Sequence, residues 1–256
     1  MKITIITVTF NAEKYLSTCI DSVIKQDYHN IEHIIVDGGS TDGTVAIIQS
    51  YNEHISRWVS EKDKGMYDAL NKGIKMATGD VIGLLNSDDM LYATNTISEI
   101  VKSFTEQKVD SVYGDLVYVD PNETNRILRY WKGKIYKRLR FLWGWMPAHP
   151  TFYIRKEIID QLGLYETHYY SACDYEFMAR YLYRFRISSY YLPKLIVMMR
   201  NGGQSNESIY KRLRANRRDY LAMKHNNIPA PLLVSFMKPL RKLPQFYSQL
   251  VQRTLS

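Results

Sequence analysis

Two kinds of hydrophobic spacing alternate along the first 115 residues, and this alternation restricts the folds open to the chain. Four runs rich in Ile, Val, Leu and Thr predict strands: residues 3–9, 31–36, 81–85 and 109–113. Four segments in which apolar residues recur every three or four positions predict helices: residues 16–24, 45–51, 67–77 and 97–104. Strands joined by helices of this length predict a parallel sheet with helices on both faces.

Polar residues follow three of the predicted strands, in the stretches Thr9–Asn11, Asp37–Ser40 and Asn86–Asp89. Because the carboxyl ends of parallel strands meet at one edge, we expect these stretches to line one ligand-binding crevice. Asp88 and Asp89 are adjacent carboxylates, and a cation would relieve their repulsion and their desolvation cost. A polar turn explains this stretch equally well on its own, but the convergence of the three stretches favours a cation site.

The composition is that of an ordinary globular protein, with 45% hydrophobic and 23% charged residues over 256 positions. Cys19 and Cys173 are far apart, which argues against a disulfide framework or a zinc site and favours a reducing cytosol. The first ten residues have the pattern of a strand and not that of a signal peptide. Since no run of eighteen apolar residues occurs, we expect a soluble or peripheral membrane protein.

The net charge of +8 comes from the last fifty residues. Residues 1–206 hold 24 basic and 24 acidic residues, whereas residues 207–256 hold ten basic and two acidic ones. Large apolar residues are interleaved with the basic ones in this tail, which suits a helix lying on an anionic membrane surface. A helix pair packed on the body of the protein, with a solvated basic face, is the alternative.

The second half of the chain has a less regular pattern. Residues 126–147 are basic and aromatic without a clear period. Beyond them the pattern predicts a helix at 174–185, strands at 187–192 and 195–199, and basic helices at 206–226 and 231–255.

Six short motifs together resemble the family 2 glycosyltransferases, whose fold is called GT-A. In chain order they are VTFN at residues 8–11, VDGGSTDGT at 36–44, DKGMYDALNKG at 63–73, ATGD at 77–80, LNSDD at 85–89 and ACDYEF at 172–177. Each motif is weak alone, but their order and spacing over residues 1–205 are specific.

The resemblance implies an α/β, GT-A-like fold: a Rossmann-type, mostly parallel sheet covered by helices, with a C-terminal helical appendage. It divides the chain into three parts. Residues 1–115 would be the nucleotide-sugar-binding half, residues 116–205 the acceptor-side half of the same catalytic domain, and residues 206–256 the basic helical tail.

The same resemblance implies a hexosyltransferase that inverts the anomeric carbon. The donor would be a nucleotide-sugar, with UDP favoured, and the acceptor a glycan or lipid-linked saccharide in surface polysaccharide biosynthesis. Mg²⁺ or Mn²⁺ held by Asp88 and Asp89 would stabilise the departing diphosphate. The family motif is commonly Asp-x-Asp, whereas Asn86 holds the first position here, which leaves open whether Asp88 or Asp89 is the direct ligand. Asp174 would be the general base, with a helix-capping role as its structural alternative.

Further motif residues would contact the donor. The implied nucleotide-sugar-binding residues are Thr9, Asn11, Asp37, Gly39, Asp63, Lys64, Asn71, Asn86, Ser87 and Asp88. Asp37 would accept a hydrogen bond from the imide N–H of uracil, or would only cap an Asx turn. Asn11 would serve equally well as the N-cap of the first helix. Asp63 and Lys64 have a solvated charge pair as their alternative, and Asn71 a structural role.

The acceptor side is implied more weakly, by His149, Arg200 and Ser205, and the resemblance also implies that the loop at residues 200–205 closes over the diphosphate. For these residues a structural histidine before a proline and a plain Gly-Gly turn are the alternatives.

Other classes of protein fit less well. A nucleotidyltransferase should have a basic, glycine-rich loop after the first strand, and residues 9–14 are neither. A nucleic-acid binder agrees with the pI of about 9.2, but the excess charge lies in the tail, so no nucleic-acid partner is expected. A non-catalytic nucleotide-sugar-binding protein conflicts with the presence of Asp174. The expected location is the cytoplasm, with residues 207–256 holding the protein peripherally on the cytoplasmic face of an anionic membrane.

Overall fold

A mixed β-sheet runs through the structure, a computed structural model that describes residues 1–202, 209–232 and 234. In this part of the chain nine strands form one sheet in the order β3-β2-β1-β4-β8-β6-β9-β5, with β7 paired to β6. The strands are β1 (Ile3–Thr9), β2 (Ile31–Asp37), β3 (Arg57–Ser60), β4 (Val81–Leu84), β5 (Met90–Leu91), β6 (Ser111–Val119), β7 (Ile127–Trp131), β8 (Tyr153–Arg155) and β9 (Ser189–Arg200).

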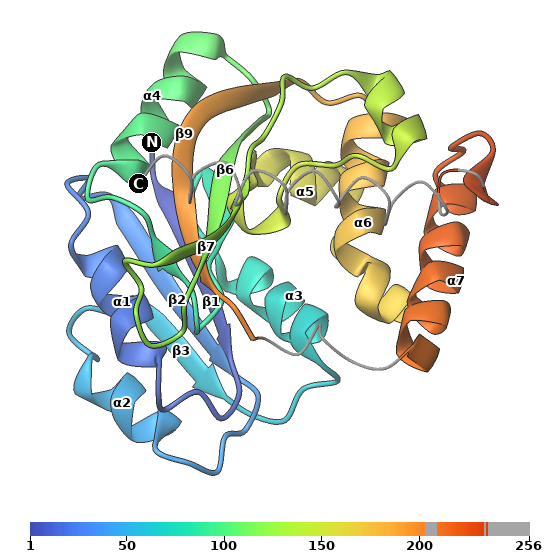
Figure 1. The fold of residues 1–256 in the computed structure, drawn as a ribbon. Coiled ribbons are helices and arrows are strands. Elements are labelled where there is room, and N and C mark those ends of the chain that lie inside the picture. The colour runs from blue at the N-terminus through green and yellow to red at the C-terminus, as the bar shows by residue number, and fades with distance from the viewer. Residues whose placement is uncertain (203–208, 233, 235–256) are drawn as a thin grey trace.

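Helices cover both faces of this sheet, as the sequence predicts. One face carries α1 (Leu16–Ile24), α2 (Thr44–Ser50) and α4 (Thr96–Gln107) (Figure 1). The other face carries α3 (Met66–Met76), α5 (Lys156–Leu162) and α6 (Cys173–Met178). The predicted α/β fold is therefore confirmed.

The parallel part of the sheet is centred on β1, which pairs with β2 on one side and with β4 on the other. Every residue of β1 is buried, as expected for a β-branched strand covered on both faces. Side chains of β2 alternate between the faces, so that Ile34 and Val36 pack towards α3 while Ile35 packs towards α1 and α2. Gly73 allows α3 to approach β1 closely, because a Cβ there would lie 2.5 Å from Ile6 Cγ2.

The second half departs from the predicted parallel arrangement. β8 lies between β4 and β6 and runs antiparallel to both, so the sheet is mixed. β9 is one strand, where the sequence pattern predicts two. Along β6, Tyr113 pairs with Tyr191 but Asp115 pairs with Leu195, so three residues of β9 oppose one residue of β6. This bulge accommodates Pro193, which has no N–H to donate to a regular ladder.

The helix predicted at residues 174–185 is present, but in two forms. α6 continues directly into a π-helix, η4 (Ala179–Arg184). Preceding it is a 3₁₀ segment, η3 (Thr167–Ala172), and both α6 and η3 contact α7 (Ile209–His225) on the side away from the sheet (Figure 1).

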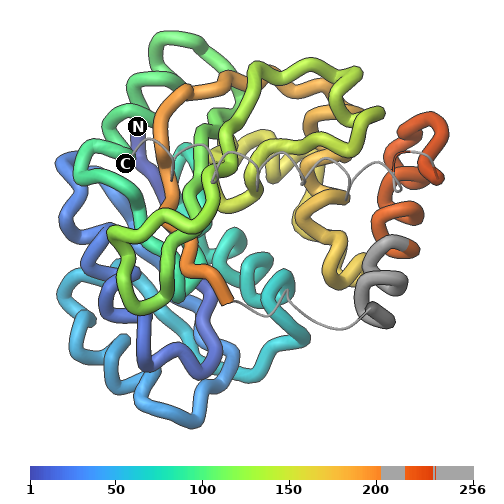
Figure 2. The backbone as a smooth tube through the Cα atoms, viewed as in Figure 1, coloured from blue at the N-terminus to red at the C-terminus, as the bar shows by residue number. Residues whose placement is uncertain are grey.

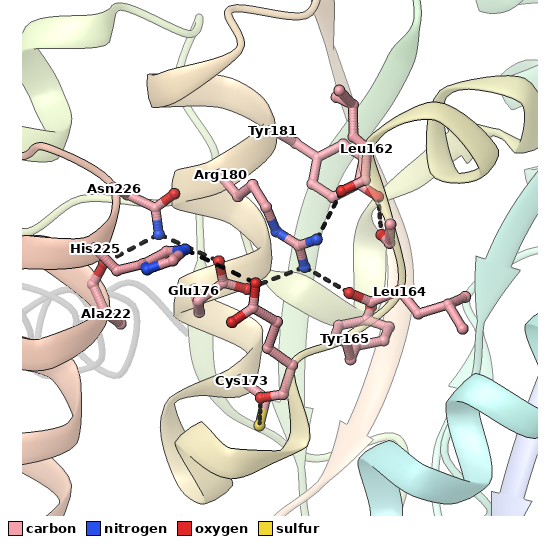
Figure 3. Close-up of polar contacts among 12 residues, drawn as sticks. Leu162, Leu164, Tyr165, Cys173, Glu176, Arg180, Tyr181, Ala222, His225 and Asn226 are labelled. Atoms are coloured by element: carbon pink, nitrogen blue, oxygen red, sulfur yellow. Dashed lines mark hydrogen bonds and ion pairs between the residues drawn. The ribbon is translucent and has the colours of Figure 1, made fainter.

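A buried polar cluster joins α7 to α6 (Figure 3). Glu176 is fully buried, and its two carboxylate oxygens accept hydrogen bonds from Arg180 at 3.0 Å and from Asn226 at 3.3 Å. Arg180 also donates to the carbonyls of Leu162 and Leu164. The positive charge of the Arg180 guanidinium balances the negative charge of Glu176. The hydrogen bond from Asn226, the residue that follows α7, then attaches the end of α7 to α6.

The predicted basic tail lies only partly in the described residues. α7 confirms the helix predicted at residues 206–226. Of the helix predicted at residues 231–255, positions 231, 232 and 234 are described and the rest, with Ser205, lies outside the described residues. Within the described part of the chain, every helix is too short or too polar to cross a bilayer.

Candidate functional site

The loops after β1, β2 and β4 meet at one edge of the sheet, as the sequence predicts. Asn11 connects the first two loops: its backbone N–H donates to Ser40 Oγ at 2.8 Å, and its Oδ1 accepts from the Thr41 N–H at 2.9 Å. Asn11 has a left-handed backbone (φ 48°), and α1 begins only at Leu16. The N-cap prediction for Asn11 is therefore wrong, because a turn at residues 12–15 separates it from the helix.

Asp37, at the end of β2, is fully buried and organises the second loop. Its Oδ2 accepts hydrogen bonds from the N–H groups of Gly39 (3.1 Å) and Ser40 (2.9 Å) and from Ser60 Oγ (2.6 Å). Its Oδ1 accepts from Ser40 Oγ, which leaves one lone pair of that oxygen for a further donor. The Asx-turn role is thus present in the structure, and the base-binding role stays a prediction.

Asp63 and Lys64 lie in the loop before α3. Asp63 Oδ1 accepts from the Gly65 N–H at 2.7 Å, and its Oδ2 lies 2.6 Å from where a Cβ on Gly38 would be. The Lys64 N–H donates to Asp68 Oδ2 at 3.0 Å, while the Lys64 side chain is exposed. This loop therefore packs against the Asp37 loop, and any side chain at Gly38 would push it away.

Asp88 and Asp89 follow β4 in an environment that disfavours charge. Asp89 is fully buried; its Oδ2 accepts from Asn86 Nδ2 at 2.8 Å, and its Oδ1 has no hydrogen-bond partner among the described residues. Asp88, like Ser87 before it, is only half-buried. Burial raises the pKa of Asp88, and burial together with the Asp88 charge raises the pKa of Asp89 well above its usual range.

The donor set at this edge fits a hard divalent cation. Two carboxylates are adjacent, and a buried carboxylate oxygen has no hydrogen bond in the described part of the chain. Oxygen ligands of this kind are those that Mg²⁺ and Mn²⁺ prefer. A bound cation would also offset the desolvation that raises both pKa values.

Arg200, the last residue of β9, lies beside this acidic pair. Its Nη1 donates to the Asp88 backbone carbonyl at 2.6 Å and its Nη2 to Thr18 Oγ1 at 3.0 Å, with the guanidinium 4.5 Å above the Tyr15 ring. Arg200 therefore lies at the end of β4 beside Asp88, and its role towards the acceptor or the diphosphate stays a prediction. The long strand β9 carries this residue back to the end of β4, which local sequence spacing does not reveal.

Asp174 is the second residue of α6, and Ala172 is the N-cap. Its Oδ1 accepts from the N–H of Tyr175 at 2.7 Å, in the first turn, where the helix dipole favours a carboxylate. Two side chains share its surroundings. The pKa of Tyr67 is raised well above its usual range by burial and then by the Asp174 charge. Burial lowers the pKa of His149, and the Asp174 charge opposes that shift.

Tyr165 joins His149 and Asn71 into one network. His149 Nε2 and Tyr165 Oη are 2.7 Å apart. Asn71 exchanges two hydrogen bonds of 2.9 Å with the backbone N–H and C=O of Tyr165. Tyr165 leaves no local signal in the sequence, because 94 residues separate it from Asn71. Tyr67 lies within the motif at residues 63–73, where only its helical spacing is evident from the sequence.

Comparison with known proteins agrees with this geometry. The family model described as Glycosyl transferase family 2 matches residues 4–163. A PGL/p-HBAD biosynthesis glycosyltransferase of Mycobacterium tuberculosis is 28% identical over 212 residues, which is 81% of this chain and 80% of that protein.

Two solved structures share the fold. S. aureus TarS 1–349 in complex with UDP-GlcNAc matches with a TM-score of 0.65 and 19% identity, over 96% of this chain and 78% of that one. The mannosyltransferase PcManGT from Pyrobaculum calidifontis, in complex with GDP-Man and Mn²⁺, matches with a TM-score of 0.66 and 18% identity, over 100% of this chain and 75% of that one. A longer TarS chain is covered over 43% of its length.

Proposed function

Because the chain belongs to glycosyl transferase family 2, we propose that it transfers a hexosyl group with inversion from a nucleoside-diphosphate sugar to a saccharide hydroxyl. The observation that carries the proposal is the desolvated Asp88–Asp89 pair, with an unpartnered Asp89 Oδ1 in the described part of the chain. It lies at the same sheet edge as the Asp37 loop, where α/β sheets bind nucleotides.

Asp88 would be the direct ligand of a divalent cation, because it is the carboxylate of the pair that solvent reaches. Asp89, held by Asn86, would support it from behind with negative charge. The cation, when bound, supplies Lewis-acid stabilisation of the diphosphate leaving group. The Arg200 guanidinium, fixed by Thr18 and Tyr15, would add a second positive charge to the same region.

The nucleotide would lie against the loop of Asp37 and the loop of Asp63. The remaining acceptor capacity of Asp37 Oδ1 suits the imide N–H of uracil, which favours UDP. The complexes of the two structural neighbours contain UDP-GlcNAc in one case and GDP-Man with Mn²⁺ in the other. Both are nucleoside-diphosphate sugars, which supports that class of donor for this chain.

Asp174 would deprotonate the acceptor hydroxyl. It lies in the first turn of α6 and is half-buried, so that an acceptor reaches it. A general base is positioned by rigid neighbours, and the Asn71–Tyr165–His149 network would hold this side of the site in place. The acceptor would be a glycan or a lipid-linked saccharide of a surface polysaccharide.

The proposal is tested with a panel of UDP- and GDP-sugars, in the presence of Mn²⁺ or Mg²⁺ and then of a chelator. We expect metal-dependent release of the nucleoside diphosphate from one donor, and NMR of the glycoside product should show an inverted anomeric centre. Release of the sugar 1-phosphate, with the nucleoside monophosphate moved to the acceptor, would instead indicate a nucleotidyltransferase.

The role of Asp174 is tested with Asp174→Asn, which should keep donor binding and lower transfer by roughly 10²-fold or more, as for a lost general base. Asp160→Asn on α5 is the matched control, since that carboxylate pairs with Lys156 on the surface, 2.7 Å away. Near-normal turnover in Asp174→Asn would assign the base to another residue.

A further inference from the structure

We infer that residues 132–143 form a surface that binds an anionic phospholipid bilayer. This inference rests on the proposed function only in that a lipid-linked acceptor would be presented there. The segment follows β7 and ends with η1 (Arg138–Trp143), and Figure 2 shows it extending beyond the sheet towards the end of η4. It belongs to the basic and aromatic stretch at residues 126–147, which contains none of the residues assigned a role in the proposed function.

Three large apolar side chains of this segment are exposed. The exposed fractions are 69% for Ile135, 69% for Leu139 and 59% for Trp143. All three lie within residues 135–143. Removal of an apolar side chain from water is favourable, and for an exposed side chain this requires another phase or a partner that covers it.

The backbone that presents these side chains is firmly attached to the body of the protein. Tyr136 Oη donates to the Leu182 carbonyl at 2.7 Å, and Arg138 Nε donates to the Tyr183 carbonyl at 3.1 Å. Phe141 is fully buried, and its ring lies 6.2 Å from that of Tyr136. The segment therefore buries one set of side chains in the core, and Ile135, Leu139 and Trp143 remain outside on a fixed support.

The charge of the segment identifies what covers it. Lys132, Lys134, Lys137 and Arg138 are all exposed, and the sequence has no acidic residue from position 124 to position 156. η1 packs against η4, and the turn after η4 adds exposed Phe185, flanked by Arg184 and Arg186. Basic residues interleaved with Trp, Phe and Leu are the pattern of a protein surface that enters the headgroup region of an anionic leaflet.

A polyanion such as a nucleic acid is the competing partner for a basic surface. It would use the lysines and arginines, but it would leave Ile135 and Leu139 in water, because a phosphate backbone offers nothing for aliphatic side chains. Trp143 also suits the bilayer interface, where aromatic residues are enriched. The exposed aliphatic residues therefore favour the bilayer.

The test is co-sedimentation of the full chain with vesicles of phosphatidylcholine and phosphatidylglycerol in equal parts, against vesicles of phosphatidylcholine alone. We expect binding to the anionic vesicles, weakened by salt. The double variant Leu139→Ser/Trp143→Ser should lower vesicle partitioning by at least roughly tenfold, since the lost apolar burial cannot be replaced. Lys134→Glu/Lys137→Glu should lower it by about tenfold or more.

Two matched controls make the same types of substitution at exposed positions outside residues 132–143. Ile24→Ser removes an apolar residue that is 38% exposed at the end of α1, and Lys102→Glu/Lys108→Glu reverses two exposed charges around the end of α4. Both should bind vesicles like the native chain. In every variant, circular dichroism and release of the nucleoside diphosphate from the donor in solution should be unchanged.

Each outcome decides the inference separately from the proposed function. Native-like vesicle binding by both 132–143 variants would overturn it and assign membrane binding to the tail at residues 207–256. Absence of native vesicle binding at low salt, with donor turnover intact, would overturn it and leave the glycosyltransferase assignment standing. If the Ser variant loses oligonucleotide binding as strongly as vesicle binding, the surface is not specific for lipid and the inference fails.

Discussion

At the scale of single residues, the buried Asp89 carboxylate opposes stability, and in the proposed function it supports metal binding. Its carboxylate is fully buried and its pKa is raised by burial and by Asp88, so the folded chain carries this charge at a cost in the absence of a cation. We predict that Asp89→Asn raises the thermal midpoint of the metal-free protein by a few degrees. The same variant should weaken Mn²⁺ binding in the presence of a nucleoside diphosphate by at least roughly tenfold.

Asp88→Asn is the informative comparison. Because Asp88 is only half-buried, removal of its charge relieves a smaller desolvation cost than removal of the Asp89 charge. It should weaken Mn²⁺ binding at least as much as Asp89→Asn while leaving the midpoint closer to that of the native chain. Calorimetric titration and a thermal scan of the metal-free proteins measure both quantities. A less stable Asp89→Asn protein with unchanged Mn²⁺ affinity would make the pair a structural turn.

At the scale of elements, Asn71 connects α3 to the segment before η3. Both of its amide groups are used by the Tyr165 backbone. We predict that Asn71→Ala lowers the free energy of unfolding by about 2 kcal/mol, because two backbone groups lose their partners. Donor affinity should stay within about twofold, whereas a donor-contacting Asn71 would lose much more, and titration with the nucleoside diphosphate separates these outcomes. Asn95→Ala, at the exposed start of α4, is the control for removing an amide.

The elements that could be predicted from sequence are those that depend on local periodicity. β1, α1, β2, α3 and β4 each bury a face that their own residues define, so hydrophobic spacing is enough. β8 could not be predicted in the same way, because it has only three residues and exists through pairing with β4, far away in sequence. The position of Arg200 depends on the whole course of β9, and Tyr165 meets Asn71 and His149 from another segment of the chain, so neither position leaves a local signal.

At the scale of the whole molecule, one buried carboxylate joins distant segments at the edge of the sheet opposite to the site. Glu32 accepts hydrogen bonds from Thr4 Oγ1, from the N–H and Oγ1 of Thr78, and from Lys2 Nζ. Burial opposes its ionisation, but these hydrogen bonds outweigh burial and lower the pKa of Glu32 to about 2. The next residue, His33, is buried neutral, and burial lowers its pKa to about 4.

Both shifts make the fold sensitive to acid. A carboxylate whose folded pKa is depressed stabilises the protein above its unfolded pKa of 4.5, and this contribution is lost as the pH falls towards 2. His33 acts in the same direction at higher pH, because the unfolded chain gains a proton below 6.5 that the folded chain accepts only near 4. Stability should therefore begin to fall below pH 6.5 and fall more steeply below pH 4.5.

Glu32→Gln separates the two contributions. The depression of the Glu32 pKa corresponds to about 3 kcal/mol at neutral pH, so the variant should be less stable than the native chain at pH 7 by up to about that amount. Its urea-unfolding free energy should then decline with acid mainly through the His33 range, with little further loss attributable to position 32 below pH 4.5. Glu53→Gln, at an exposed position, should reproduce the native profile at every pH. If the unfolding free energies of Glu32→Gln and the native chain run parallel between pH 5 and pH 3, protonation of Glu32 does not contribute to the acid response. In that case its four hydrogen bonds contribute equally whether or not the carboxyl group is charged.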